Sequence, residues 1–142
     1  MVNGTRTHLT LYLTGGYLLL IVYASLYPLA DWRDSGGNPL VFLTAAWPRY
    51  YTGFDLATNV AVYLPFGFLC AAVLRRHLPG IPAWLLTTLL GSAVSLSLEL
   101  LQNYLPDRVP SNLDLACNAT GTLLGAWLGA SKGGYLLDEG RL

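Results

Sequence analysis

Charged side chains are scarce in this chain. Only 11% of its 142 residues are Asp, Glu, Lys or Arg, whereas 54% are hydrophobic. Soluble domains usually carry about 25% charged residues, because charged groups cover the surface that faces water. The eight basic and eight acidic residues balance to a net charge of zero, so the chain lacks the basic excess with which proteins hold nucleic acid. The composition therefore indicates a membrane protein whose surroundings are the lipid bilayer, and it excludes nucleic acid as a partner.

Cysteine and histidine are also rare, with two residues of each. Cys70 and Cys117 are predicted to lie at different depths of the membrane, so we expect no disulfide between them. Neither cysteine has the ligand spacing of a metal site. We therefore expect neither a resident metal nor a cofactor.

Four long apolar segments make up most of the chain. Each approaches or exceeds the roughly 17 to 25 residues with which a helix crosses about 30 Å of hydrocarbon. They predict an all-α fold, a bundle of four transmembrane helices that forms one domain over residues 1 to 142. The segments are Leu9 to Leu26, Leu56 to Leu74, Ile81 to Leu105 and Leu113 to Ala130.

Basic residues predict how this bundle is oriented. The short turn Arg75-Arg76-His77 between the second and third segments is the strongest signal, because cytoplasmic loops carry an excess of Lys and Arg. With this turn inside, both termini are cytoplasmic and the loop over residues 27 to 55 lies outside. In that loop Asn38-Pro39 precedes the apolar stretch Leu40 to Trp47, which is too short to cross the bilayer. We expect it to form a short interfacial or re-entrant helix.

A stripe of polar side chains runs along the third segment. Its members follow one another at helical spacings and share one face: Ser92, Ser95, Glu99 and Gln102. A carboxylate inside an apolar span costs about 2.5 to 3.5 kcal/mol on insertion scales, so it usually faces a protein interior or a watery cavity and has a partner. Glu99 is therefore the leading functional residue.

The predicted topology brings further polar residues to the same half of the membrane as Glu99. Arg108 lies in the short connection between Glu99 and Asp114, where it can pair with either carboxylate or bind a phosphate or carboxylate of a ligand. We therefore expect one polar pocket just below the outer surface. Its predicted ligand-binding residues are Asp55, Asn59, Glu99, Gln102, Arg108, Asp114 and Asn118.

Two further patterns concern the second and fourth segments. The stretch Asp55 to Asn59 matches Asp114 to Asn118 at four of five positions, which indicates either a parallel internal repeat or two independent helix caps with the aspartates at the N-cap. In the fourth segment Gly121, Gly125 and Gly129 recur every four residues. Such a stripe lets another helix approach closely, within the chain or in a second copy of it.

Several short motifs occur in a fixed order between residues 50 and 130. They are Asp55-x3-Asn59, Leu64-Pro65-Phe66-Gly67-Phe68, Glu99-x2-Gln102, Leu105-Pro106, Arg108, Asp114-x3-Asn118 and Gly121-x3-Gly125. Together they resemble the VanZ-like family of small bacterial membrane proteins, which is named for a protein linked to resistance to the glycopeptide teicoplanin. The resemblance implies a role in the cell envelope and a place in the bacterial plasma membrane, and it leaves antibiotic resistance open.

Three functions remain open at this point. In the leading one, the pocket binds an anionic envelope component, either a polyprenyl-phosphate lipid or a peptidoglycan precursor, and Arg108 holds the anion. In the second, the polar cluster only fixes helix packing, and function depends on a partner membrane protein or on homo-oligomers. In the third, the protein is an enzyme on a lipid-linked substrate, with Glu99 or Asp114 as acid or base. Against the third, no histidine is predicted near the cluster.

Overall fold

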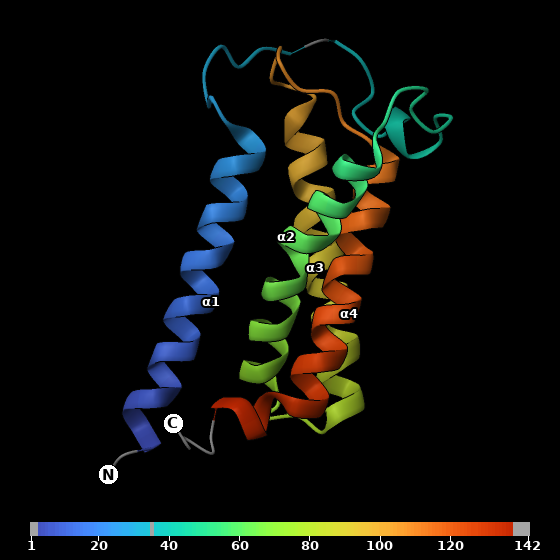
Figure 1. Cartoon of the computed structure of the whole chain (residues 1–142). Helices are drawn as coiled ribbons and strands as arrows, with labels where there is room; N and C mark the ends of the chain where they lie inside the picture. Colours follow the sequence, from blue (N-terminus) through green and yellow to red (C-terminus); the bar gives the residue numbers. More distant parts are fainter. Residues whose placement is uncertain (1–2, 35, 138–142) are drawn as a thin grey trace.

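The computed structural model describes residues 3–34 and 36–137 of the chain, and this part contains helices and no strand. The all-α fold class is thereby confirmed. The elements are α1 (Asn3–Leu26), the 3₁₀ turn η1 (Val41–Leu43), α2 (Gly53–Leu74), α3 (Gly80–Gln102) and α4 (Asn112–Leu137). The four α-helices lie side by side as an elongated bundle (Figure 1).

The bundle has two distinct ends (Figure 1). The loop end holds residues 27–52 and the connection 103–111. The terminal end holds the first turns of α1, the turn between α2 and α3, and the last turns of α4. The Arg75-Arg76-His77 turn lies at the terminal end, and all seven predicted ligand-binding residues belong to the half of the bundle near the loop end.

Three helices are long and apolar enough to cross a membrane: α1 from His8 onward, α2 and α3. In α4 polar and glycine residues dilute the apolar ones, so the fourth span stays a prediction. α3 ends at Gln102, three residues before the predicted Leu105. The chain turns there because the amides of Tyr104 and Leu105 bond the carbonyls three residues back, and Pro106 follows.

The predicted helix of the first loop is shorter than expected. Only Val41–Leu43 forms a turn of 3₁₀ helix. The Asn38 side chain accepts a hydrogen bond from the Leu40 amide at 3.0 Å and so forms an Asx turn ahead of this helix, whose N-cap residue Leu40 makes no side-chain cap bond. Beyond this turn the loop is tied to the bundle, because the Asn112 side-chain amide donates to the Ala45 carbonyl at 2.7 Å. Because the Ala45 carbonyl accepts this bond, its hydrogen-bonding capacity is satisfied without a continued helix.

The most extensive helix contact joins α2 and α4, which run in parallel from the loop end (Figure 1). Three glycines of α4 lie so close to α2 that a β-carbon would overlap a backbone carbonyl. The pairs are Gly121 with Val60, Gly125 with Leu64 and Gly129 with Phe68. Gly67 of α2 fits in the same way against Thr122 of α4. The glycine stripe therefore serves a contact within the chain, and it is the kind of contact that holds helices together in lipid.

α1 contacts the bundle less extensively than α4 does. Near the loop end its Ile21 and Leu26 join a buried cluster with Tyr63 and Phe66 of α2 and Leu98 of α3. Much of the rest of α1 exposes large apolar side chains, as a helix surrounded by lipid does. The polar contacts of α1 therefore contribute strongly to holding this helix against the bundle.

Gly125→Ala should weaken the contact between α2 and α4. The new methyl group would meet the Leu64 carbonyl, which belongs to a helix backbone and cannot move aside alone. We expect the free energy of unfolding in detergent to fall by about 1 to 3 kcal/mol, the usual range for overpacking. Gly15→Ala is the matched control, because no atom lies within 4 Å of a β-carbon at Gly15. Equal stability of the two variants would contradict the described packing.

Candidate functional site

The N-termini of α2 and α4 are capped alike. Before α2, the Thr52 hydroxyl accepts the amide hydrogen of Asp55 at 3.1 Å, and the Asp55 carboxylate accepts the Thr52 amide at 2.9 Å. This is a capping box. Before α4, the Ser111 hydroxyl accepts the amide hydrogen of Asp114 at 3.2 Å. Both aspartates therefore occupy the third helical position, and the prediction that they stand at the N-cap is wrong.

The similarity between the two helix starts thus extends three residues further toward the N-terminus than the matched stretches. Thr52 precedes Asp55 by the same interval at which Ser111 precedes Asp114. A hydroxyl residue three positions before a carboxylate is a known signal of a helix start. This pattern identifies Thr52 and Ser111 as capping residues, whereas charged residues in apolar segments do not point to them.

Glu99 takes the place of Asp114 in the second cap. Its Oε2 accepts the amide hydrogen of Ser111 at 2.7 Å, which is the bond that Asp55 makes in the first cap. Glu99 is only 4% exposed, so this bond is made in the interior and joins the end of α3 to the start of α4. The Asp114 carboxylate therefore does not take part in the cap of α4. It lies beside Asn59 and within electrostatic range of Asp55, both of α2.

Polar side chains of three helices meet in the interior near Glu99. The Asn118 side-chain amide donates to the Ser95 hydroxyl at 2.9 Å, and both residues are buried. The Tyr63 hydroxyl lies beside Ser95 without a well-aligned hydrogen bond, and the Asn118 Oδ1 has no hydrogen-bond partner either. Buried polar atoms are normally paired with protein or water. A water molecule or a polar group of a ligand would supply the missing hydrogen bonds of the Tyr63 hydroxyl and the Asn118 Oδ1.

Arg108 and Gln102 hold the end of α1. Arg108 donates from Nε to the Tyr27 carbonyl at 3.1 Å and from Nη2 to the Ala24 carbonyl at 3.0 Å. Gln102 donates to the Ser25 carbonyl at 3.0 Å. The last carbonyls of a helix lack partners within it, and a cation also suits the negative end of its dipole.

Arg108 does not form the ion pair that the sequence allowed. Among the described residues it pairs with neither Glu99 nor Asp114, and its guanidinium bonds α1 instead. The predicted pocket is therefore divided: Arg108 and Gln102 bond the end of α1, Asp114 lies beside Asn59 and near Asp55 of α2, and Asn118 bonds Ser95 of α3. Glu99 bonds the cap of α4.

The loop end is acidic as a whole. Asp31, Asp34, Asp55, Glu99, Asp107 and Asp114 belong to it, against Arg33, Arg49 and Arg108. Within the described part of the chain, no three His, Cys, Asp or Glu side chains gather closely enough to hold a metal ion. The electrostatic field at this end therefore favours hydrogen-bond donors and cations near the aspartates.

A groove of about 450 Å³ runs along α3 and α4 near the loop end. Small side chains, among them Ala93, Ala116 and Ala119, keep it open, and Asn112 belongs to the same lining. Ser92 of the predicted polar stripe lines this groove, whereas Ser95 and Glu99 of the same stripe are buried. The volume lies within the range of about 300 to 1,000 Å³ that is usual for ligand sites. No pattern in the sequence indicates this groove, because it forms between two helices.

Comparison with known families gives one match. The VanZ/LLP1 family matches residues 11–132, from α1 into the last turns of α4. Neither a curated protein nor a solved structure matches the chain. The family match confirms the resemblance that the motifs between residues 50 and 130 indicated, and it extends over α1 and the first loop.

Two substitutions at Glu99 separate its charge from its hydrogen bond. Glu99→Gln keeps an oxygen that can accept the Ser111 amide, so we expect near-normal stability. Glu99→Ala leaves that buried amide without a partner, and we expect the free energy of unfolding to fall by about 1 to 3 kcal/mol. Unfolding in detergent measures both variants. If Glu99→Ala were as stable as Glu99→Gln, the bond to Ser111 would have no structural weight.

Arg108→Ala should loosen α1 without disturbing the other helices. The change removes two hydrogen bonds to the end of α1, so amide hydrogen exchange over residues 22 to 30 should become faster, while exchange in α2 and α4 stays as it was. Arg49→Ala, in the exposed first loop, is the matched control. Unchanged exchange at the end of α1 would show that Arg108 does not hold it.

Proposed function

This chain is a membrane protein of the VanZ/LLP1 family, and we propose that it binds a lipid-linked component of the bacterial cell envelope at the loop end of the bundle. The component is a polyprenyl-phosphate lipid or a peptidoglycan precursor. In this proposal all four α-helices cross the plasma membrane, both termini are cytoplasmic, and the loop end faces outward. The basic turn at Arg75 and Arg76 supports that orientation.

The groove between α3 and α4 is the observation that carries the proposal. It is a ligand-sized hollow in the wall of a bundle that lipid surrounds, and three alanines and three leucines make most of its lining apolar. A hydrocarbon chain lying along Ala93, Ala116 and Ala119 would bury apolar surface on both sides. Its head group would then lie near Asn112, close to the cap that Ser111 and Glu99 form.

The charges of the loop end support a head group rich in hydrogen-bond donors. Asp55, Asp114 and Asn59 can accept bonds from hydroxyl, amide or ammonium groups. Arg108 keeps further N–H groups, beyond the two that bind α1, for a phosphate. A peptidoglycan precursor carries both kinds of group, whereas a bare polyprenyl phosphate offers only the anion to an end that is acidic overall. We therefore favour the precursor, and an effect on teicoplanin susceptibility would follow if binding alters its exposure.

A structural role of the polar cluster is the second candidate. Glu99, Gln102 and Arg108 all form hydrogen bonds within the chain, and each of these bonds joins two separate elements. Under this alternative the cluster fixes the packing of the helices, and function depends on a partner membrane protein or a second copy.

Native mass spectrometry of the protein in mild detergent separates the two candidates. Ala116→Leu fills the groove, so we expect about a tenfold loss of co-purifying polyprenyl or precursor lipid, which corresponds to a clash of about 1.4 kcal/mol. Ala57→Leu, at an exposed position of α2, is the matched control and should retain the lipid. Glu99→Gln and Arg108→Lys test the head group, since Lys keeps the charge of Arg but loses its planar fork. Equal lipid retention in every variant would reject the proposal and leave the structural role.

A further inference from the structure

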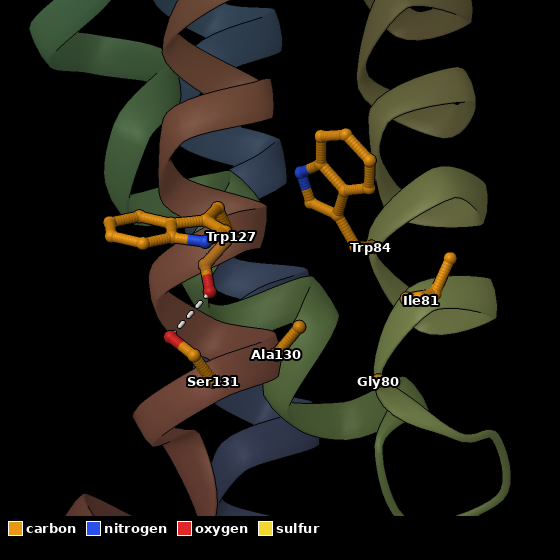
Figure 2. A pocket seen from close by; sticks show the side chains of 6 residues that line it. All are labelled: Gly80, Ile81, Trp84, Trp127, Ala130 and Ser131. Carbon is orange, nitrogen blue, oxygen red and sulfur yellow. Dashed lines mark hydrogen bonds between the residues drawn. The ribbon is translucent and has the colours of Figure 1, made fainter.

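A second hollow lies at the terminal end, between the first turns of α3 and the last turns of α4 (Figure 2). Its volume is about 220 Å³. The residues that line it are Gly80, Ile81, Trp84, Trp127, Ala130 and Ser131. The Trp84 indole is held in place, because its Nε1 donates to the Leu123 carbonyl at 3.1 Å. Trp127 is 57% exposed and flanks the opening from α4.

The lining of this hollow offers almost no polar group to a ligand. Its only hydroxyl, on Ser131, already donates to the Trp127 carbonyl at 2.7 Å, the bond drawn in Figure 2. The other lining side chains are hydrocarbon or indole, and the indole nitrogen of Trp84 is bonded to α4. An occupant therefore has to be apolar where it enters the hollow.

One basic side chain, Arg75, lies beside the hollow, and a second basic residue follows the lining in sequence. The Arg75 guanidinium lies against Gly80, with Nη1 at 3.9 Å from the position of a β-carbon there. Arg75 uses Nη1 to bond the Leu78 carbonyl at 3.2 Å and retains its other N–H groups. Lys132 follows Ser131 in α4 and is exposed. The sequence holds no Asp or Glu from 56 to 98 or from 115 to 137, so no carboxylate of these segments offsets the basic charge.

We infer that the hollow binds one anionic phospholipid. An acyl chain packs against Trp84, Trp127 and Ile81, and the phosphate lies at Arg75 and Lys132. Charge complementarity favours an anionic head group, and tryptophan is the side chain that sits at the level of lipid head groups. This site shares no residue with the groove at the loop end, so the inference stands apart from the proposed function.

Quenching of tryptophan fluorescence by brominated lipids tests the inference. The chain has four tryptophans. The double variant Trp32→Phe, Trp47→Phe removes the two exposed ones of the first loop and leaves Trp84 and Trp127 as reporters. This protein is reconstituted into phosphatidylcholine vesicles that contain brominated phosphatidylglycerol or brominated phosphatidylcholine with identical chains. We expect brominated phosphatidylglycerol to reach half-maximal quenching at about a fivefold lower mole fraction than brominated phosphatidylcholine. A difference of about fivefold in affinity is what one basic residue near an anionic lipid surface contributes.

Charge variants in the same background identify the residues responsible. Arg75→Gln should abolish most of the preference for phosphatidylglycerol, and Lys132→Gln should reduce it. Arg49→Gln, in the first loop at the opposite end, is the matched control and should leave the preference unchanged. Equal quenching by the two lipids, or a preference that survives Arg75→Gln, would overturn the inference. Weak quenching by both lipids together with a cross-linked dimer would also overturn it, because a second copy would then cover the hollow.

Discussion

The hydrogen bond from the Ser111 amide to the Glu99 carboxyl group is the contact on which the loop end depends. It closes the connection between α3 and α4, and it completes the cap of α4 from a different helix. Because Glu99 does this, the Asp114 carboxylate is free to lie beside Asn59 of α2. The same closed connection carries Arg108 to the end of α1. One buried acidic side chain thus determines which of the neighbouring polar groups are committed to the fold.

The close approach of α2 and α4 gives this arrangement its frame. Lipid offers helices no hydrophobic driving force for association, so backbone contact at small residues takes its place. The glycines of α4 lie against backbone carbonyls of α2 and set the distance between the two parallel helices. At that distance the stretches Asp55 to Asn59 of α2 and Asp114 to Asn118 of α4 lie at the same height in the bundle. Asp114 therefore lies close to Asn59 and Asp55.

The two ends of the bundle differ in charge and in the hollows that they offer. The loop end is acidic and lies near a groove of about 450 Å³ between α3 and α4. The terminal end has a smaller, indole-lined hollow of about 220 Å³, with Arg75 beside it. Both hollows lie between α3 and α4, each lined by residues of these two helices. We therefore propose a different lipid for each end. The loop end would bind an envelope component rich in hydrogen-bond donors, and the terminal end an anionic phospholipid.

Although the sequence left open whether the glycine stripe contacts this chain or a second copy, it predicted the helical class, the membrane setting, the family and the half of the bundle in which the polar residues gather. These are properties of single segments, which hydropathy and spacing report directly. The fold was needed to show that Arg108 bonds the Ala24 carbonyl, 84 positions away, that Glu99 replaces Asp114 in a cap, that the glycine stripe packs against α2, and that the loop helix shrinks to one turn. A long polar side chain can reach several partners that are equally near in sequence. Its actual partner depends on where the other helices lie, which no local pattern encodes.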